Sequence, residues 1–197
     1  MTFRNAVISI MGSLCFAPVA GAASIYTVTE LAALAGFGSS TPTGINDNGQ
    51  VVGYSTSSIS GTGSGDTQAV LWLAGSTAPI ELGILGGSYT TATGINNNGQ
   101  VVGSAYTSGG YYHAVLWQSP YGVPTDLGTL GGNSSKAAGI SNSGQVVGEA
   151  DSGNGTPHPA LWQAGATTAT DLDTAEKAVA CDWHGSQQAG ESPAITL

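Results

Sequence analysis

The chain has 197 residues, of which 41% are hydrophobic and only 8% are charged, while 31 are glycine. This composition fits a globular protein of short strands and tight turns. It argues against a protein of long helices, which would be richer in Glu, Lys and Arg. The formal net charge of −9, with only three Lys and Arg residues, argues against binding to DNA, RNA or anionic lipid, because such binding depends on a cationic surface.

Residues 1–22 have the pattern of a secretory signal peptide. Arg4 precedes an almost wholly apolar run over 6–20, and Ala20-Gly21-Ala22 offers the small-x-small pattern of a cleavage site. The run falls short of the about 20 apolar residues that a membrane span needs. We therefore predict cleavage after Ala22 and export to the periplasm, the cell surface or the extracellular space.

An internal repeat fills the mature chain over 23–172. The segments TGINDNGQVVGYS from Thr43, TGINNNGQVVGSA from Thr93 and AGISNSGQVVGEA from Ala138 align without gaps. Each is followed by an apolar block that ends in tryptophan and by a short acidic-Leu element, so the three repeats span about 43–82, 93–127 and 138–172. The block-ending residues Trp72, Trp117 and Trp162 lie 45 positions apart, since 117 − 72 and 162 − 117 are both 45.

Each repeat contains four candidate strands. The first two meet at a tight turn, where Gly49, Gly99 or Gly144 supplies the positive φ that a hairpin demands. Four strands in about 45 residues are typical of a β-propeller blade. Apolar residues at successive positions of the inner strands predict that both faces of each sheet are buried. This favours an all-β, propeller-like array of four-stranded antiparallel units over the alternative, a β-trefoil.

The repeats are too few to close a ring. Three blades fall below the roughly four to eight of closed propellers, and residues 24–31 resemble only the last strand of a repeat. The segment 173–197 lacks both Gly-Ile-Asn and Gln-Val-Val-Gly. We expect an incomplete array with an orphan strand over 24–31 and a divergent, poorly ordered tail. A truncated longer array and self-association through unprotected edge strands both stay open.

These motifs resemble the extracellular HAF-type repeat family of bacterial secreted proteins. Its units carry a His-Ala-Phe block near a Trp, an Asp-Leu-Gly-x-Leu-Gly-Gly element and a Gly-Ile-Asn-x-x-Gly-Gln-Val-Val-Gly hairpin. The similarity covers about 25–172 and is clearest at 113–117 and 126–132. This chain departs from the pattern at the Phe positions (Val70, Val115, Leu161), at Gln68 in place of His, and at Pro159 in place of Ala. The resemblance implies secretion and a propeller-like fold, and brings no established activity, cofactor or catalytic residue.

Several residues invite a catalytic or metal-binding interpretation. His113 and His158 recur at one repeat position, but the first repeat has Gln68 there, which favours structural hydrogen bonding over catalysis. The turn Asn46-Asp47-Asn48-Gly49 looks like a calcium loop, yet the other two copies lack a carboxylate, which calcium binding needs. We therefore predict no catalytic, cofactor-binding or metal-binding residue.

Aromatic residues fall into two groups. The repeated Trp72, Trp117 and Trp162 end apolar strands and are predicted to lie in the core. Tyrosines in the variable loops, Tyr106, Tyr111, Tyr112 and Tyr121, are the predicted contact surface, because tyrosine combines apolar area with a polar tip.

The leading hypothesis is a non-catalytic binding module that uses its variable loops to contact an extracellular ligand such as a glycan or another envelope component. One alternative is a structural or adhesive array that self-associates. A lesser alternative is a glycoside hydrolase that uses loop carboxylates, since such pairs meet only in the fold.

Overall fold

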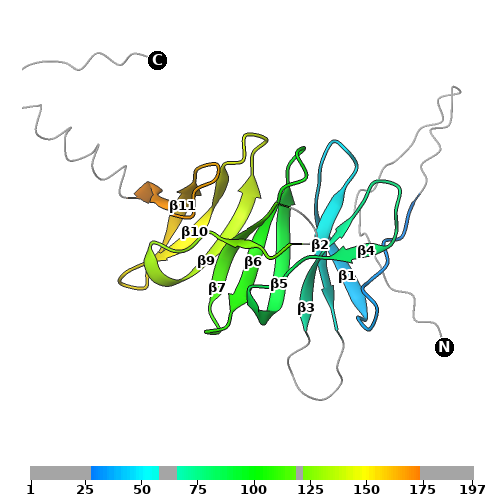
Figure 1. Cartoon of the computed structure of the whole chain (residues 1–197), viewed down its shortest axis with the longest axis horizontal. Helices are drawn as coiled ribbons and strands as arrows, with labels where there is room; N and C mark the ends of the chain where they lie inside the picture. Colours follow the sequence, from blue (N-terminus) through cyan, green and yellow to red (C-terminus); the bar gives the residue numbers. More distant parts are fainter. Residues whose placement is uncertain (1–27, 58–65, 119–121, 174–197) are drawn as a thin grey trace, which may run out of the picture.

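The computed structural model describes residues 28–57, 66–118 and 122–173, and these residues are nearly all in β-strands and turns (Figure 1). The predicted all-β class is confirmed. The predicted signal peptide and all but the first residue of the predicted tail lie outside the described residues.

Twelve strands are described, and they fall into three sets along the chain. The first set contains β1 (Ser39–Ile45), β2 (Val51–Thr56), β3 (Thr67–Trp72) and β4 (Pro79–Glu81). The second set contains β5 (Gly86–Ile95), β6 (Val101–Thr107), β7 (Tyr112–Trp117) and β8 (Thr125–Asp126). The third set contains β9 (Gly131–Ile140), β10 (Val146–Ser152), β11 (Pro157–Trp162) and β12 (Thr170–Asp171).

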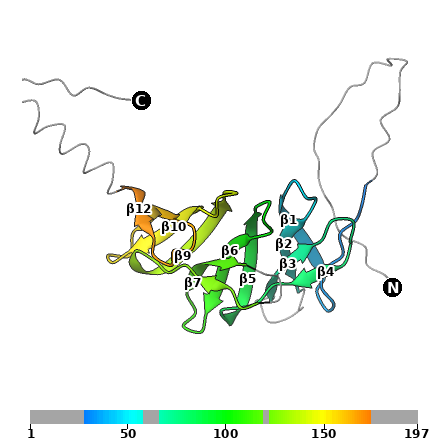
Figure 2. The same cartoon turned by 45° about the horizontal axis from the view of Figure 1, so that its top comes forward.

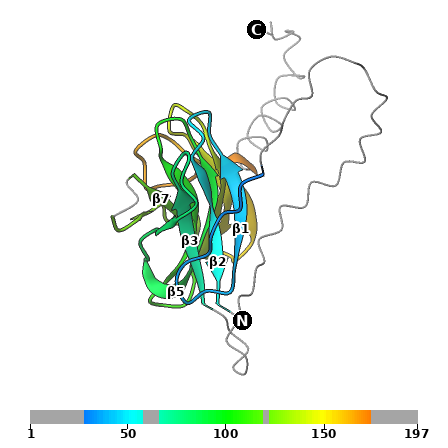
Figure 3. The same ribbon diagram turned by 90° about the vertical axis from the view of Figure 1, so that its right-hand side faces the viewer.

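Within each set, consecutive strands pair antiparallel. The sets follow one another across the molecule, with β1 at one side and β11 at the other, and a turned view keeps this order (Figures 1 and 2). A single parallel pair, Thr67 with Tyr89, joins β3 to β5, so the first two sets form one eight-stranded sheet beside the four-stranded third sheet. The strands overlap when viewed along the row (Figure 3), and neighbouring sets are in contact, β2 with β5 and β6 with β9.

The turn between the first two strands of each set has the same geometry. In the first set, the backbone N–H of Gly49 donates to the carbonyl of Asn46, and Asn46 N–H donates to the carbonyl of Gln50. Gly49, Gly99 and Gly144 have φ of 75°, 77° and 84°. This left-handed conformation favours glycine and closes a three-residue hairpin loop.

The glycine that follows each Val-Val pair is needed for a different reason. Opposite Gly53, Gly103 and Gly148, the first strand of the set carries a register shift. A Cβ atom on Gly103 would overlap the backbone carbonyl of Thr91, and the same overlap would occur at Gly53 with Thr41 and at Gly148 with Lys136. Glycine therefore lets the two backbones approach at the bulge.

The core consists of two apolar clusters, one at each junction between sets. The first junction joins residues of the first set such as Val52 and Leu71 to Val101, Val115 and Trp117 of the second. The second junction joins Val102, Ala114 and Leu116 of the second set to Val146, Ala150, Ala160 and Trp162 of the third. Because Val101 and Val102 are both buried and neighbouring residues point to opposite faces, the second set is covered on both sides.

Each tryptophan at the end of an apolar strand is almost completely buried. The exposed fractions of Trp72, Trp117 and Trp162 are 1%, 1% and 0%. Their indole Nε1 groups donate to the carbonyls of Ala32, Gly83 and Leu127, at 3.0, 2.9 and 2.6 Å. Each acceptor lies in the segment that precedes the set to which the tryptophan belongs, so the tryptophan fixes the entry of the chain into its own set.

The segment before β1 is described only in part. An orphan strand is predicted over 24–31, of which residues 24–27 lie outside the described residues. Residues 28–31 form no strand, and Val28 is 89% exposed. The third strand of each set already pairs with its own fourth strand, so residues 28–31 have no such edge to join. The chain instead contacts the first set through Ala32 and through Leu34, whose N–H donates to Ser55 Oγ at 3.2 Å.

Hydrogen bonds cross both junctions at equivalent positions. Thr43 Oγ1 donates to the carbonyl of Ala92 at 2.7 Å, and Thr93 Oγ1 donates to that of Ala137 at 2.8 Å. At the turns, Asn46 Nδ2 donates to the carbonyl of Asn96, and Asn96 Nδ2 to that of Ser141, each at 2.9 Å. Asn46 and Asn96 are 8% and 3% exposed. The turn asparagines therefore hold neighbouring sets together as well as shaping their own hairpins.

The first prediction concerns Trp117. Replacing Trp117 with Ala should lower the free energy of unfolding by about 3–5 kcal/mol, because it leaves a cavity between two sets. Trp117→Phe, which removes the bond to Gly83 but keeps much of the apolar contact, should cost less. Denaturant unfolding measures both changes, with Tyr111→Ala at an exposed loop as the control. An unchanged midpoint for Trp117→Ala would contradict the core assignment.

The second prediction concerns the bulge glycine Gly103. Gly103→Ala should destabilise the protein by about 1–3 kcal/mol, because the added methyl group meets backbone that cannot move aside without breaking the strand pair. Gly153→Ala is the matched control, since its Cβ would have no atom closer than 3.9 Å. Equal thermal melting of the two variants would show that the bulge tolerates a side chain.

Candidate binding surface

The variable loops of the second and third sets lie at one end of the molecule, opposite the asparagine turns. Each asparagine turn joins the first two strands of a set, and the variable loop follows at the far end of the second strand. The β6–β7 and β10–β11 loops can be followed at this end in Figure 1. Residues 58–65 of the corresponding β2–β3 loop lie outside the described part of the chain.

Three tyrosines from three neighbouring strands meet next to the β6–β7 loop. Tyr106 of β6 and Tyr112 of β7 are paired in register, and their ring centroids are 4.1 Å apart. Tyr89 of β5 lies 5.4 Å from each of them, and its ring is edge-on to Tyr112. All three are half-buried. We call Tyr89, Tyr106 and Tyr112 the tyrosine cluster.

A glycine makes room for the tyrosine cluster. A Cβ atom on Gly87 would overlap the Cβ and the backbone of Tyr106. The start of β5 can therefore lie close against β6 only because this residue has no side chain. This close approach brings Tyr89, two residues further along β5, within ring contact of β6 and β7.

The tyrosine cluster has a cation beside it. Lys136 Nζ of β9 lies 5.6 Å from the ring centroid of Tyr112, a distance at which a cation–π attraction acts. The same Nζ lies 3.4 Å from Glu149 Oε1, and both side chains are about half exposed, at 53% and 55%. Lys136 therefore contributes a positive group to a chain that has only three Lys and Arg residues.

The neighbouring tyrosines also affect the ionisation of Tyr112. A hydrogen bond to Tyr106, together with burial and the nearby Tyr89, raises the pKa of Tyr112 well above its ordinary value. The phenol of Tyr112 therefore stays protonated in neutral and mildly alkaline solution. The cluster offers hydroxyl groups and ring faces rather than a phenolate charge.

A groove of about 760 Å³ adjoins the cluster through Lys136. Its lining combines hydroxyls and apolar side chains with one acid–base pair. The second set contributes Thr91, Thr93 and Ser104, and the third contributes Lys136, Ala138, Val147, Glu149, Pro157, His158 and Pro159 among others. A mixed apolar and hydroxyl lining with few charges suits an uncharged polar ligand.

The structure brings together only part of the predicted contact surface. Tyr106 and Tyr112 belong to the cluster, whereas Tyr111 lies in the β6–β7 turn and is 48% exposed. Tyr121 lies outside the described residues. Tyr89 was missed because it precedes the aligned motif, although the other repeats have Ser39 and Ser134 at the equivalent place. That difference between repeats was the signal that could have identified it.

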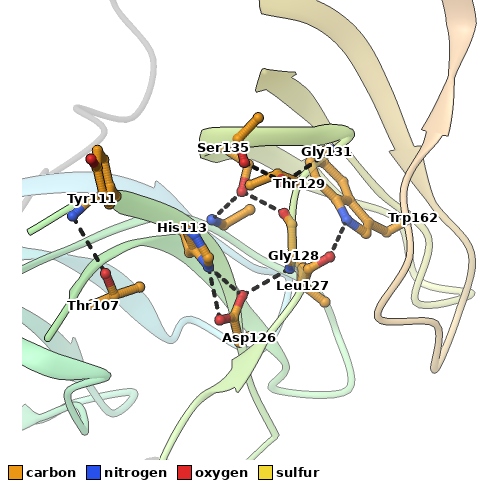
Figure 4. Close-up of polar contacts among 12 residues, drawn as sticks. Thr107, Tyr111, His113, Asp126, Leu127, Gly128, Thr129, Gly131, Ser135 and Trp162 are labelled. Atoms are coloured by element: carbon orange, nitrogen blue, oxygen red, sulfur yellow. Dashed lines mark hydrogen bonds and ion pairs between the residues drawn. The ribbon is translucent and has the colours of Figure 1, made fainter. Parts of the chain in front are cut away.

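The repeated histidines link two strands of the same set. His113 Nδ1 lies 2.8 Å from Asp126 Oδ2 (Figure 4), and His158 Nδ1 lies 2.7 Å from Asp171 Oδ2. In the first set, Gln68 instead accepts a hydrogen bond from Thr90 Oγ1 at 3.1 Å. The position thus serves hydrogen bonding in all three sets with two different residue types.

The surroundings of His113 do not resemble a nucleophile and its base. The nearby hydroxyl of Ser135 accepts a hydrogen bond from Ala114 N–H at 2.9 Å and donates to the carbonyl of Gly128 at 2.6 Å (Figure 4). It is therefore engaged with backbone groups. Across 28–57, 66–118 and 122–173, no group of three or more His, Cys, Asp or Glu residues could hold a metal ion.

Comparison of the chain with family models, curated proteins and solved structures gives no match. The resemblance to the HAF-type repeat family therefore remains a prediction from the sequence motifs. In the part of the chain that the structure describes, no helix is long and apolar enough to span a membrane.

The third prediction tests the role of His113. His113→Gln should unfold with a midpoint close to that of the wild type, because the first set uses glutamine at this position. His113→Ala should lose about 1–3 kcal/mol of stability, since Asp126 then loses a hydrogen-bond partner. Urea titration of the two variants gives the comparison. A glutamine variant as unstable as the alanine variant would show that the site requires an imidazole.

Proposed function

We propose that this protein is an exported, non-catalytic binding module whose three strand sets stack as in an incomplete β-propeller. The same antiparallel strand order in each set supports this arrangement, and so do the apolar clusters at both junctions. A set that is covered on both faces fits stacked blades better than a β-trefoil. Export is supported by the signal-like pattern of residues 1–22.

The observation that carries the binding proposal is the convergence of three tyrosines beside a groove. Core packing does not require this cluster, because the equivalents of Tyr89 are Ser39 and Ser134 and the equivalent of Tyr106 in the third set is Asp151. Tyrosines gathered at one place next to a variable loop on a rigid sheet are well suited to recognition.

The ligand class that fits best is a neutral glycan. Sugar rings present C–H groups that pack on aromatic faces, and their hydroxyls can bond to tyrosine, threonine and lysine. Polyanions are disfavoured, because the chain carries a formal charge of −9 and would repel them. Lys136 and Glu149 supply one donor and one acceptor in the lining of the groove.

The fourth prediction tests this ligand class. The purified protein should bind members of an array of neutral glycans, and Tyr112→Ala should weaken the binding of the best member by about tenfold or more. Tyr54→Ala in the first set is the matched control and should bind as the wild type does. Thermal melting of each variant shows that the fold is retained.

Two results would contradict the proposal. Binding to no glycan on the array would remove the ligand class, and equal affinities of the Tyr112 and Tyr54 variants would move the site away from the tyrosine cluster.

A further inference from the structure

The hydrogen bonds that recur at both junctions between strand sets have a direction. At each junction, the donors at four recurring positions belong to the earlier set and the acceptors to the later one. The first position is a threonine: Thr43 and Thr93 each donate to a carbonyl of the next set. The second is a turn asparagine: Asn46 and Asn96 do the same. The second turn asparagine gives the third: Asn48 Nδ2 donates to the carbonyl of Asn97, and Asn98 Nδ2 to that of Asn142.

The fourth recurring donor is a backbone group. Ala69 N–H donates to Thr90 Oγ1 at 2.8 Å, and Ala114 N–H donates to Ser135 Oγ at 2.9 Å. Other contacts also cross the junctions. The backbone N–H of Asp47 or Asn97 donates to the next turn, and every turn retains this group. At the first junction, Asn97 Nδ2 donates to Asp47 Oδ2 and Thr90 Oγ1 donates to Gln68 Oε1, in the opposite direction, but these two contacts do not recur at the second junction. The four positions therefore distinguish a set that can hold a successor from one that cannot.

The third set lacks a suitable donor at all four positions. The residues there are Ala138, Ser141, Ser143 and Pro159. Alanine has no hydroxyl, and proline has no N–H. The two serine side chains are shorter than asparagine and are 2.8 Å from one another. The third set therefore cannot donate to a following set the hydrogen bonds by which the first set holds the second and the second holds the third.

Charge on the same face reinforces this ending. Thr91 and Ser104, paired across β5 and β6, correspond to Lys136 and Glu149, paired across β9 and β10. Ser104 is 5% exposed beneath the third set. Stacking a further set would bury both charges at a high desolvation cost. Inward-facing charges are a known means by which β proteins prevent unwanted association.

We propose that the third set is a terminating set. Its outer face, which carries Lys136, Ala138, Val147, Glu149 and Pro159, does not accept a further repeat or the first set of a second copy. Val147 is 47% exposed there, whereas the equivalent Val52 and Val102 are both at 0%. The part of the groove that these residues line is thereby kept open. The inference is independent of the glycan proposal, because it concerns only how repeats stack.

The first set offers the matching half of such a junction. Its outer side has Pro42, Ile45 and Val51 where the second set has Ala92, Ile95 and Val101. Pro42 is exposed, and Ile45 is 68% exposed. A second copy could therefore dock here if the third set carried the missing donors.

The fifth prediction restores those donors. The variant carries the residues of the second set on the third, namely Lys136→Thr, Ala138→Thr, Ser141→Asn, Ser143→Asn, Glu149→Ser and Pro159→Ala. Sedimentation velocity should show the wild type at one mass at all concentrations. The restored variant should rise with concentration toward at least double that mass, and adding Ile45→Lys should return it to monomer.

Two outcomes would overturn the proposal. The first is association of the wild-type protein that Val147→Lys abolishes, because the outer face of the third set would then already be an interface. The other is a folded restored variant that stays monomeric. If circular dichroism shows that the variant with six substitutions does not fold, a triple variant is tested in the same way. It carries Lys136→Thr, Glu149→Ser and Pro159→Ala. It should associate more weakly but measurably, and a monomer at every concentration would likewise overturn the proposal.

Discussion

The burial of one tryptophan per strand set is the interaction on which the rest of the structure depends. Each indole is almost completely buried, and its Nε1 donates to a carbonyl of the segment that enters its set. One side chain thus supplies apolar contact and fixes the chain path at the same point. A buried indole N–H without an acceptor would cost free energy, so the entering segment must lie where the carbonyl can be reached. The position of each set relative to the chain before it follows from this requirement.

Much of this could be predicted from the sequence, because spacing in a repeat reports directly on structure. The recurrence of Trp72, Trp117 and Trp162 predicted a shared core role, and their burial agrees with it. The hairpin glycines could also be predicted, since a positive φ is a local requirement of the turn. Features within one repeat were therefore accessible before any contact between repeats was known.

The features that escaped prediction involve contacts between repeats or the lack of a partner. Asn46 and Asn96 read as ordinary turn residues, and their bonds to the next set exist only because the turns stack. Tyr89 lies in a segment that looked like a connection between repeats, so its approach to Tyr106 depended on the bulged start of β5. Residues 28–31 resemble a strand but form none, because a strand needs an edge to pair with.

Lys136 connects the end of the stack with the candidate site. Lys136 occupies the position at which the second set has Thr91. Its charged Nζ belongs to the outer face of the third set and lies 5.6 Å from the ring centroid of Tyr112. A further set stacked on this face would cover the part of the groove that Lys136, Glu149 and Pro159 line. The substitutions that make the third set unsuitable for stacking therefore also keep the groove accessible. In a repeat scaffold, a binding surface can arise in this way where one copy departs from the pattern that its neighbours share.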